Sequence, residues 1–385
     1  MRSRLRIAAS LLIISMLLVN LAGCRGKKPQ SRPEERAPGG NTLTSHLKVM
    51  GFYDERQEKP NETVLKALRD HAEVINYLAP FWYQIKVDGS LMDQSDDKDF
   101  DWVKGKIKIV PLVNNHKGND EFLHNAAART KAINNLVKVA TERGYDGWKI
   151  DFQLLSAQSR DVQTAFMSDL HKALKAKGKI LAVDVIPVLQ APNDPNAYDY
   201  KGLAANSDFL VIMAYDRHSD ESKPGPVAPY TWTVQVLDQF VKKEGIDPKK
   251  LVLGVAAYGY DWVEGGKKGA TSIPDKEVHS LLAAQKITPK WDDKEKTNYF
   301  TYTTKAGAHE VWFEDEKSLP YRIDLARKYG LWGIALWRMG YEEDNWWQAL
   351  RAELTKQAAA GGAVGGAGTA PAPAAPGAVP GAPAR

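Results

Sequence analysis

The sequence of 385 residues predicts a (β/α)8 TIM barrel of the α/β class, with a small α+β insertion between its seventh and eighth strands. Two observations support this prediction. Short β-branched or apolar runs alternate with helical stretches, which is the pattern of βα units. Eight such units in about 310 residues fit a single barrel. A doubly wound open sheet is the competing architecture, but the glycine-rich phosphate turn expected after its first strand is missing.

The predicted strands are short apolar runs that follow one another along the chain. In order, they are Leu47–Tyr53, Val74–Ala79, Ile107–Val113, Gly147–Gln153, Ile180–Ile186, Phe209–Tyr215, Leu251–Tyr258 and Trp332–Trp337. Helical periodicity marks Asp120–Arg143 and Arg160–Lys177, which lie between strands three, four and five.

The connection between strands seven and eight is long, and we assign residues 262–318 to the insertion. It holds a helical segment at Ile273–Gln285 and an alternating segment at Tyr299–Thr303. A turn at Lys305–Ala308 and a second strand-like run at Glu310–Phe313 follow. This mixture of helix and strands predicts a small α+β unit on the rim of the barrel.

The first residues resemble an export signal. Three arginines precede an apolar run, Ile7–Val19, which is followed by Leu-Ala-Gly-Cys at 21–24. A secretory signal in residues 1–23 is predicted, because a basic start and about 13 apolar residues are followed by small residues of the kind found at a cleavage site. The run is shorter than the ~20 residues of a membrane span.

The end of this signal resembles the bacterial lipoprotein box, which would make Cys24 the lipidated first residue of the mature protein. Cys24 is the only cysteine, so the exported domain can form no internal disulfide. We therefore expect a secreted protein anchored by lipid to the bacterial cell envelope. Because Arg25 follows, the outer membrane is favoured if the envelope is Gram-negative. The alternative is an ordinary signal peptide with a chance cysteine.

Composition separates the barrel from the two ends of the chain. Residues 24–45 are polar and proline-bearing, and predict a flexible tether. Residues 357–385 are almost wholly Ala, Gly and Pro, and predict a disordered tail. The formal charge of +5 comes from these ends, because residues 46–356 hold 43 Lys/Arg and 45 Asp/Glu. A nucleic-acid binder would carry positive charge on its folded surface, so that class is excluded. We expect a monomer.

The most informative stretch is 146–153, Asp-Gly-Trp-Lys-Ile-Asp-Phe-Gln. Side chains of a barrel strand alternate between the lumen and the helix layer. The large apolar residues of the stretch are expected to face the helices. Lys149, Asp151 and Gln153 then point inward at the carboxyl-end mouth, where barrel enzymes do their chemistry. Burying unpaired charge is costly, so three polar groups there indicate a functional site.

This stretch resembles the strand-four signature of glycoside hydrolase family 18, the chitinase-type hydrolases, written Asp-Gly-x-x-x-Asp-x-Glu. Other strands carry further resemblances: Met213–Asp216 matches Met-x-Tyr-Asp, and Ala335–Arg338 carries the tryptophan that floors the cleavage subsite. Asn76–Trp82 and Gly254–Trp262 resemble most closely the bacterial spore-cortex and peptidoglycan-associated branch. Together these motifs extend the resemblance over residues 46–356.

The resemblance implies substrate-assisted cleavage through the sugar's N-acetyl group. Asp151 would orient the acetamido group, Tyr215 would hydrogen-bond its carbonyl oxygen, and Trp337 would stack under the ring. The residues assigned to catalysis are Asp146, Asp151, Gln153 and Tyr215. Those assigned to substrate binding are Tyr53, Trp82, Lys149, Asp184, Met213, Asp216 and Trp337. Neither a metal nor an organic cofactor is expected, because metal-ligand spacings are missing.

Two residues depart from the family pattern. Gln153 stands where the glutamate should protonate the leaving oxygen, a step worth about 10²–10⁴-fold in rate, and an amide has no titratable proton to give. Lys149 stands where the family has Asp or Asn. Its ammonium either pairs with Asp151 and holds it ionised, or reaches Asp184.

Three functions follow from this pattern. The first is a catalytically impaired chitinase-like protein that binds β-1,4-linked N-acetylglucosamine glycans, chitin or peptidoglycan. The second is a working glycosidase in which Asp184 or Asp216 replaces the missing acid. The third is a structural envelope lipoprotein that uses the barrel as a scaffold. By resemblance, the insertion aromatics Tyr299, Phe300, Tyr302 and Trp312 would wall the sugar groove, or else they form the insertion's own core.

Overall fold

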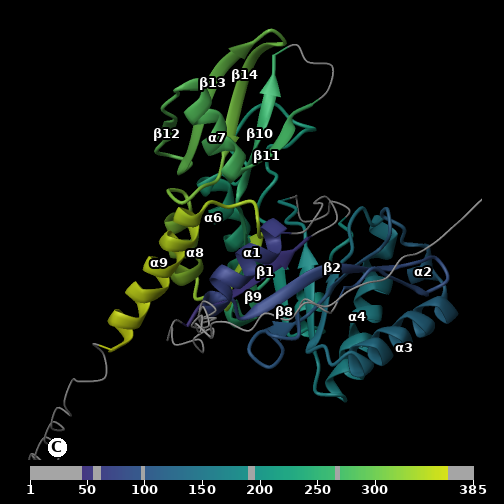
Figure 1. Cartoon of the computed structure of the whole chain (residues 1–385). Helices are drawn as coiled ribbons and strands as arrows, with labels where there is room; N and C mark the ends of the chain where they lie inside the picture. Colours follow the sequence, from purple (N-terminus) through teal and green to yellow (C-terminus); the bar gives the residue numbers. More distant parts are fainter. Residues whose placement is uncertain (1–45, 55–61, 97–99, 190–195, 265–268, 363–385) are drawn as a thin grey trace, which may run out of the picture. The chain divides into compact units, whose positions relative to one another are not determined.

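The computed structural model of the protein describes residues 46–54, 62–96, 100–189, 196–264 and 269–362 (Figure 1). Cys24, the predicted signal and tether, and most of the predicted tail lie outside these ranges. Within these ranges, no helix combines the length and the apolar character needed to cross a membrane.

Eight parallel strand positions close into a barrel. They are β1 (Lys48–Tyr53), β2 (Tyr77–Ile85), β4 and β5 (Lys108–Ile109 and Leu112–Asn114), β6 (Gly147–Asp151), β7 (Ile180–Val185), β8 (Phe209–Ile212), β9 (Leu251–Ala256) and β15 (Gly333–Trp337). Strand β1 pairs with both β2 and β15, which closes the ring. A short strand, β3 (Leu91–Asp93), pairs antiparallel with the end of β2. The predicted barrel is confirmed.

Helices connect the strands, as the βα pattern requires. They are α1 (Glu62–His71), α2 (Glu121–His124), α3 (Ala126–Glu142), α4 (Arg160–Lys175), α5 (Tyr200–Ala205), α6 (Tyr230–Asp238), α8 (Leu319–Lys328) and α9 (Asp344–Gly362). The helical stretch predicted at Asp120–Arg143 is two helices. Asn125 separates them, because its side chain caps α3 by accepting a hydrogen bond from the Ala128 amide at 3.1 Å.

Side chains of the strands divide between two apolar layers. The lumen layer consists of Met50, Phe52, Ala79, Val110, Leu112, Ala182, Phe209, Val211, Val252 and Ala335. Trp148, Ile150 and Phe152 instead pack in the layer between the sheet and the helices. The alternation predicted for strand four is therefore confirmed, and it directs Lys149 and Asp151 into the barrel.

Several strand limits differ from the prediction; the second strand ends at Ile85 rather than Ala79, and the fourth ends at Asp151 rather than Gln153. Val74 belongs to a 3-10 turn (Ala72–Val74), so the second strand begins later, at Tyr77. The sixth strand ends at Ile212 rather than Tyr215. The seventh ends at Ala256, and after Ala257 the chain enters a strand of a second sheet, β10 (Tyr258–Val263). The Ala257 amide donates to Trp337 O at 3.0 Å, and Ala257 O accepts from the Asp275 amide at 3.1 Å.

The insertion is a five-stranded antiparallel sheet with one helix (Figure 1). Its elements are β10, β11 (Thr271–Pro274), α7 (Asp275–Gln285), β12 (Lys290–Asp292), β13 (Thr297–Thr304) and β14 (Gly307–Phe313). Phe300 packs with α7 residues in the insertion's own core. On the opposite face, Tyr299 stacks on Trp312 at 4.4 Å between ring centres. Phe300 therefore belongs to the insertion's own core, with Tyr302 packed against it, whereas Tyr299 and Trp312 lie outside that core.

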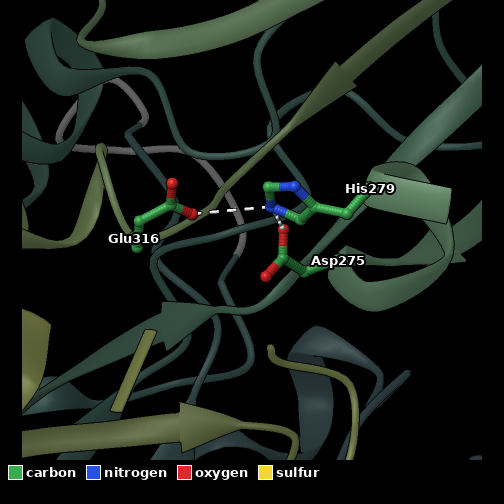
Figure 2. A group of neighbouring side chains, drawn as sticks. All are labelled: Asp275, His279 and Glu316. Carbon is green, nitrogen blue, oxygen red and sulfur yellow. Dashed lines mark ion pairs between the residues drawn. The ribbon is translucent and has the colours of Figure 1, made fainter. Parts of the chain in front are cut away.

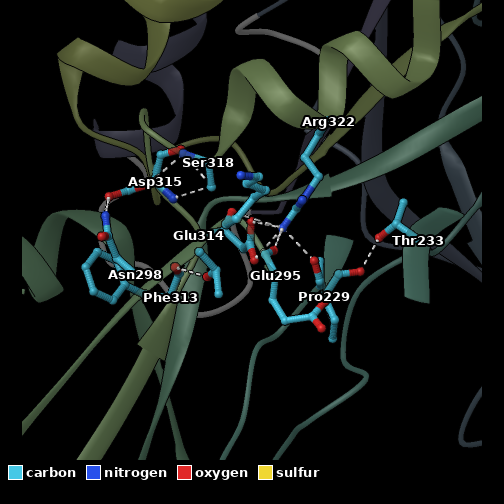
Figure 3. Close-up of polar contacts among 12 residues, drawn as sticks. Pro229, Thr233, Glu295, Asn298, Phe313, Glu314, Asp315, Ser318 and Arg322 are labelled. Carbon is cyan, nitrogen blue, oxygen red and sulfur yellow. Dashed lines mark hydrogen bonds and ion pairs between the residues drawn. The ribbon is translucent and has the colours of Figure 1, made fainter. Parts of the chain in front are cut away.

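A buried ion pair anchors the insertion to the barrel helices. Arg322 of α8 donates through one nitrogen to the Glu314 carboxylate, at 3.0 and 3.2 Å (Figure 3). The same nitrogen donates to Ala228 O at 2.6 Å, just before α6. Both side chains are almost fully buried, so each charge depends on the other. This contact fixes the end of β14 against α6 and α8.

Candidate functional site

A pocket of about 270 Å³ opens at the carboxyl ends of the barrel strands. Eight residues line it: Phe52, Asp151, Gln153, Ile186, Met213, Tyr215, Asp216 and Trp337. Six of these were predicted from the sequence, and they come from β6 and the segment after it, from the segment after β8, and from β15. This end of a β/α barrel is where the fold places its chemistry.

Gln153 is fixed beside Asp151. Its amide nitrogen, Nε2, donates to both Asp151 carboxylate oxygens, at 2.8 and 3.0 Å. Asn115 holds the backbone of Gln153 from both sides, accepting from its N–H at 3.0 Å and donating to its carbonyl at 2.8 Å. The Gln153 side chain therefore lies in the pocket as a hydrogen-bond donor without an ionisable proton.

Lys149 lies below this pair, inside the barrel. Its ammonium forms an ion pair with the Asp184 carboxylate, and both side chains are fully buried. The ammonium also lies 3.7 Å from the centre of the Phe52 ring. Burial raises the pKa of Asp184 to about 7, against the opposing effect of Lys149. Of the two partners proposed for Lys149, Asp184 is the one in ion-pair contact.

Tyr215 and Trp337 supply the aromatic surfaces of the pocket. Burial and the nearby carboxylates hold the pKa of Tyr215 well above its usual value, so its hydroxyl remains a neutral donor. Gly254 makes room for this ring, because a Cβ there would lie 2.8 Å from Tyr215 Cε1. Trp337 is half-buried and rests edge-on against Phe52, with ring centres 4.9 Å apart.

Asp216 is held by two tyrosines from the insertion sheet. Tyr258 and Tyr260 donate their hydroxyls to Asp216 Oδ1 at 2.5 and 3.0 Å. The backbone of Asp216 adopts a left-handed φ of 58°, a strained conformation that is common at functional sites. The Asp216 side chain is exposed, but the groups around its carboxyl displace part of its hydration water. This loss of solvation raises the pKa of the carboxyl.

Five residues predicted for the site do not line the pocket. Tyr53 and Trp82 are each 1% exposed and pack against Phe100 in the helix-side layer. The preceding residue on each strand, Phe52 or Phe81, faces the lumen instead. The prediction therefore selected the outward-facing residue of each pair. Lys149 and Asp184 are buried as a pair beneath the pocket, where neither can contact a sugar in it.

Asp146 is the fifth correction, because it lies at the opposite end of the barrel. It precedes β6, and its carboxylate pairs with Lys108 at 2.7 Å and accepts from the Ile109 amide at 2.9 Å. The following Gly147 is needed for strand packing, since a Cβ there would lie 2.0 Å from Ile180 O. The first half of the signature is thus structural.

Sequence reasoning missed Phe52, Ile186 and Asn115. Applying the inward–outward alternation to β1, as was done for β6, would have selected Phe52 rather than Tyr53. Ile186 follows the end of β7 and carries no chemical signal. Asn115 acts through its contacts with the Gln153 backbone, which only the fold reveals.

Comparisons with known proteins agree with this geometry. YdhD of Bacillus subtilis, whose name assigns it to the sporulation-specific glycosylases, is 30% identical over 295 residues. The match covers 72% of this chain and 70% of YdhD. The cortical fragment-lytic enzyme of Bacillus cereus is 26% identical over 310 residues, covering 76% of this chain and 71% of that enzyme.

A solved chitinase from Chromobacterium violaceum is similar in structure, with a TM-score of 0.71 and 29% identity. The superposition covers 82% of this chain and 99% of the chitinase. The family model of the glycosyl hydrolases family 18 matches residues 48–342, which span the barrel and its insertion. The chain therefore belongs to glycoside hydrolase family 18.

Proposed function

We propose that this protein binds β-1,4-linked N-acetylglucosamine glycan in the barrel pocket and hydrolyses it poorly or not at all. The observation that carries the proposal is the Gln153 amide, which donates to Asp151 where the family's proton donor belongs. The remaining polar and aromatic groups of the pocket are those that an acetamido sugar requires.

The bound sugar would lie over Trp337, with its acetamido group between Asp151 and Tyr215. The Tyr215 hydroxyl can donate to the acetamide carbonyl, and Asp151 can accept from the acetamide N–H. Gln153 can donate a hydrogen bond to the glycosidic oxygen, but it cannot transfer a proton as the bond breaks. The leaving alkoxide would then depart unprotonated, which removes the general-acid contribution to the rate.

Peptidoglycan is the glycan that we propose over chitin. The names of the two Bacillus relatives refer to sporulation and to the lysis of cortical fragments, and a cell-envelope location would place peptidoglycan within reach. Chitin shares the same acetamido sugar and linkage, so it should bind to the same pocket with the same dependence on Trp337.

Trp337→Ala is expected to weaken binding by about tenfold to 100-fold, because it removes the apolar platform under the sugar. The measurement is co-sedimentation with purified peptidoglycan sacculi and with chitin, supported by calorimetric titration of chito-oligosaccharides. Trp291→Ala is the matched control, since Trp291 is also half-buried but lies outside the pocket. Equal binding by wild type and Trp337→Ala would contradict the proposed site.

A second candidate function is slow hydrolysis with Asp216 as the substitute acid. Asp216 lines the pocket and its pKa is raised, as a carboxyl that donates a proton near neutral pH requires. Asp184 is a poor substitute, because it is buried against Lys149. Turnover that survives Gln153→Ala but is lost in Asp216→Asn would support this second function.

We also propose that lipidated Cys24 anchors the barrel to the envelope, as the Leu-Ala-Gly-Cys sequence indicates. Cys24→Ser should move the protein from the membrane fraction to the soluble fraction after cell lysis. Metabolic labelling with a fatty acid should mark the wild-type protein and leave the variant unmarked. Equal membrane retention of both forms would exclude the anchor.

A further inference from the structure

Three ligand-type side chains converge at the base of the insertion (Figure 2), and none of them lines the proposed glycan pocket. Asp275 is the first residue of α7, His279 lies one turn later, and Glu316 follows β14. The His279 Nε2 atom lies 3.2 Å from Asp275 Oδ1 and 3.5 Å from Glu316 Oε2. The three atoms lie within 4.8 Å of one another, so a single ion could contact all of them.

The three facing atoms are buried and poorly satisfied. Among the described residues, none of Asp275 Oδ1, His279 Nε2 and Glu316 Oε2 has a hydrogen-bond partner with acceptable geometry. The Asp275 side chain is fully buried, and its other oxygen lies 3.4 Å from the Glu343 amide. One proton on Nε2 can point at only one of the two carboxylates. Buried polar atoms of this kind call for an additional partner.

We propose that Asp275, His279 and Glu316 bind a divalent transition-metal ion of the zinc class. With metal–ligand bonds of about 2.0–2.1 Å, tetrahedral geometry separates neighbouring ligand atoms by about 3.3 Å. The two separations from Nε2 bracket this value. One imidazole and two carboxylates suit zinc better than calcium or magnesium, which prefer oxygen ligands alone. Water would fill the fourth position.

The surrounding charges favour a cation. Asp315, next to Glu316, is also buried, and it adds a third carboxyl close to the two that would hold the ion. Lys317 is the opposing positive charge that acts on Glu316.

The ion would connect α7 to the β14–α8 segment and act on stability rather than on the reaction at Asp151.

The experiment uses the full-length protein without a histidine tag, dialysed against EDTA and titrated with zinc chloride. Calorimetry should show one bound equivalent of zinc, and bound zinc should raise the melting temperature of the protein. His279→Ala and Glu316→Gln should each weaken this binding by roughly 100-fold. His171→Ala is the matched control, because His171 faces a single carboxylate, Asp208, at 3.4 Å.

Loss of zinc binding in both ligand variants but not in His171→Ala would support the site. Absence of a stoichiometric equivalent in the wild type would overturn the proposal. So would equal binding by wild type and His279→Ala. In those cases the cluster is a contact of one histidine with two carboxylates and holds no ion.

Discussion

Gln153→Glu is expected to raise the rate of chito-oligosaccharide hydrolysis by about 10²–10⁴-fold over the wild type. The substituted carboxyl would occupy the position from which the amide now donates to Asp151. The Asn115 side chain contacts only the main-chain N–H and carbonyl of residue 153, so the exchange of the side chain leaves these contacts unchanged. The measurement is release of a chromophore from an aryl N-acetylglucosamine oligomer, together with product analysis after digestion of peptidoglycan.

Two controls define what this result means. Gln153→Ala should behave like the wild type, because neither side chain can give a proton. Asp216→Asn in the wild-type background tests for a substitute acid, since Asp216 is the other carboxyl that lines the pocket with Asp151. Wild-type turnover already as fast as that of the glutamate variant would contradict the assignment of Gln153 as the defect.

Lys149→Met is expected to lower the free energy of unfolding by about 3–5 kcal/mol at pH 8, because it leaves the Asp184 charge buried without a partner. Burial raises the folded-state pKa of Asp184 to about 7, above its unfolded value of 3.8. A carboxyl whose pKa is higher in the folded state stabilises the fold at low pH, and this stability is lost as pH rises through the folded-state pKa. The variant should therefore lose less stability at pH 5, where Asp184 is protonated.

The matched control removes both charges. Lys149→Met combined with Asp184→Leu should cost no more than about 1–2 kcal/mol, because an apolar pair of similar volume can replace a buried ion pair. The measurement is denaturant unfolding followed by tryptophan fluorescence. It gives the loss of unfolding free energy, relative to the wild type, for the single and the double variant at pH 5 and at pH 8. If the single and double variants lost equal stability at pH 8, the unpaired charge would not be the cause.

The barrel was predictable because its strands repeat a simple physical pattern. Each strand is a short apolar run, and Trp148, Ile150 and Phe152 face the helices as their size requires. This alternation correctly directed Asp151 and Gln153 into the pocket. Motifs after other strands added Tyr215, Asp216 and Trp337, because parallel strands bring their carboxyl ends together.

The errors arose where residue type alone could not show which way a side chain points or where a strand ends. Tyr53 and Trp82 are aromatic residues near strand ends, but their side chains point outward. The alternating apolar residues after Ala256 continue into β10, so sequence pattern alone did not mark the change of sheet. Lys149 had two acids within plausible reach, and only the spatial order of β6 and β7 identified Asp184.

Asp275, His279 and Glu316 escaped notice for a related reason. The first two are four residues apart on one helix, a spacing that occurs often by chance. Glu316 comes from a different segment, and the pairing of β10 with β14 helps to bring it near α7. A site assembled from such distant residues has no continuous signature in the chain.

Ala257 is the only residue between the barrel strand β9 and the insertion strand β10, and its two backbone bonds reach Trp337 and Asp275. Two hydrogen bonds, both made by the Ala257 backbone, therefore connect Trp337 of the pocket to Asp275, the first residue of α7. An ion that stiffened α7 should slow deuterium exchange at the Ala257 amide, and glycan lying on the indole should slow the same amide. A single peptide unit would then report on occupancy at both places.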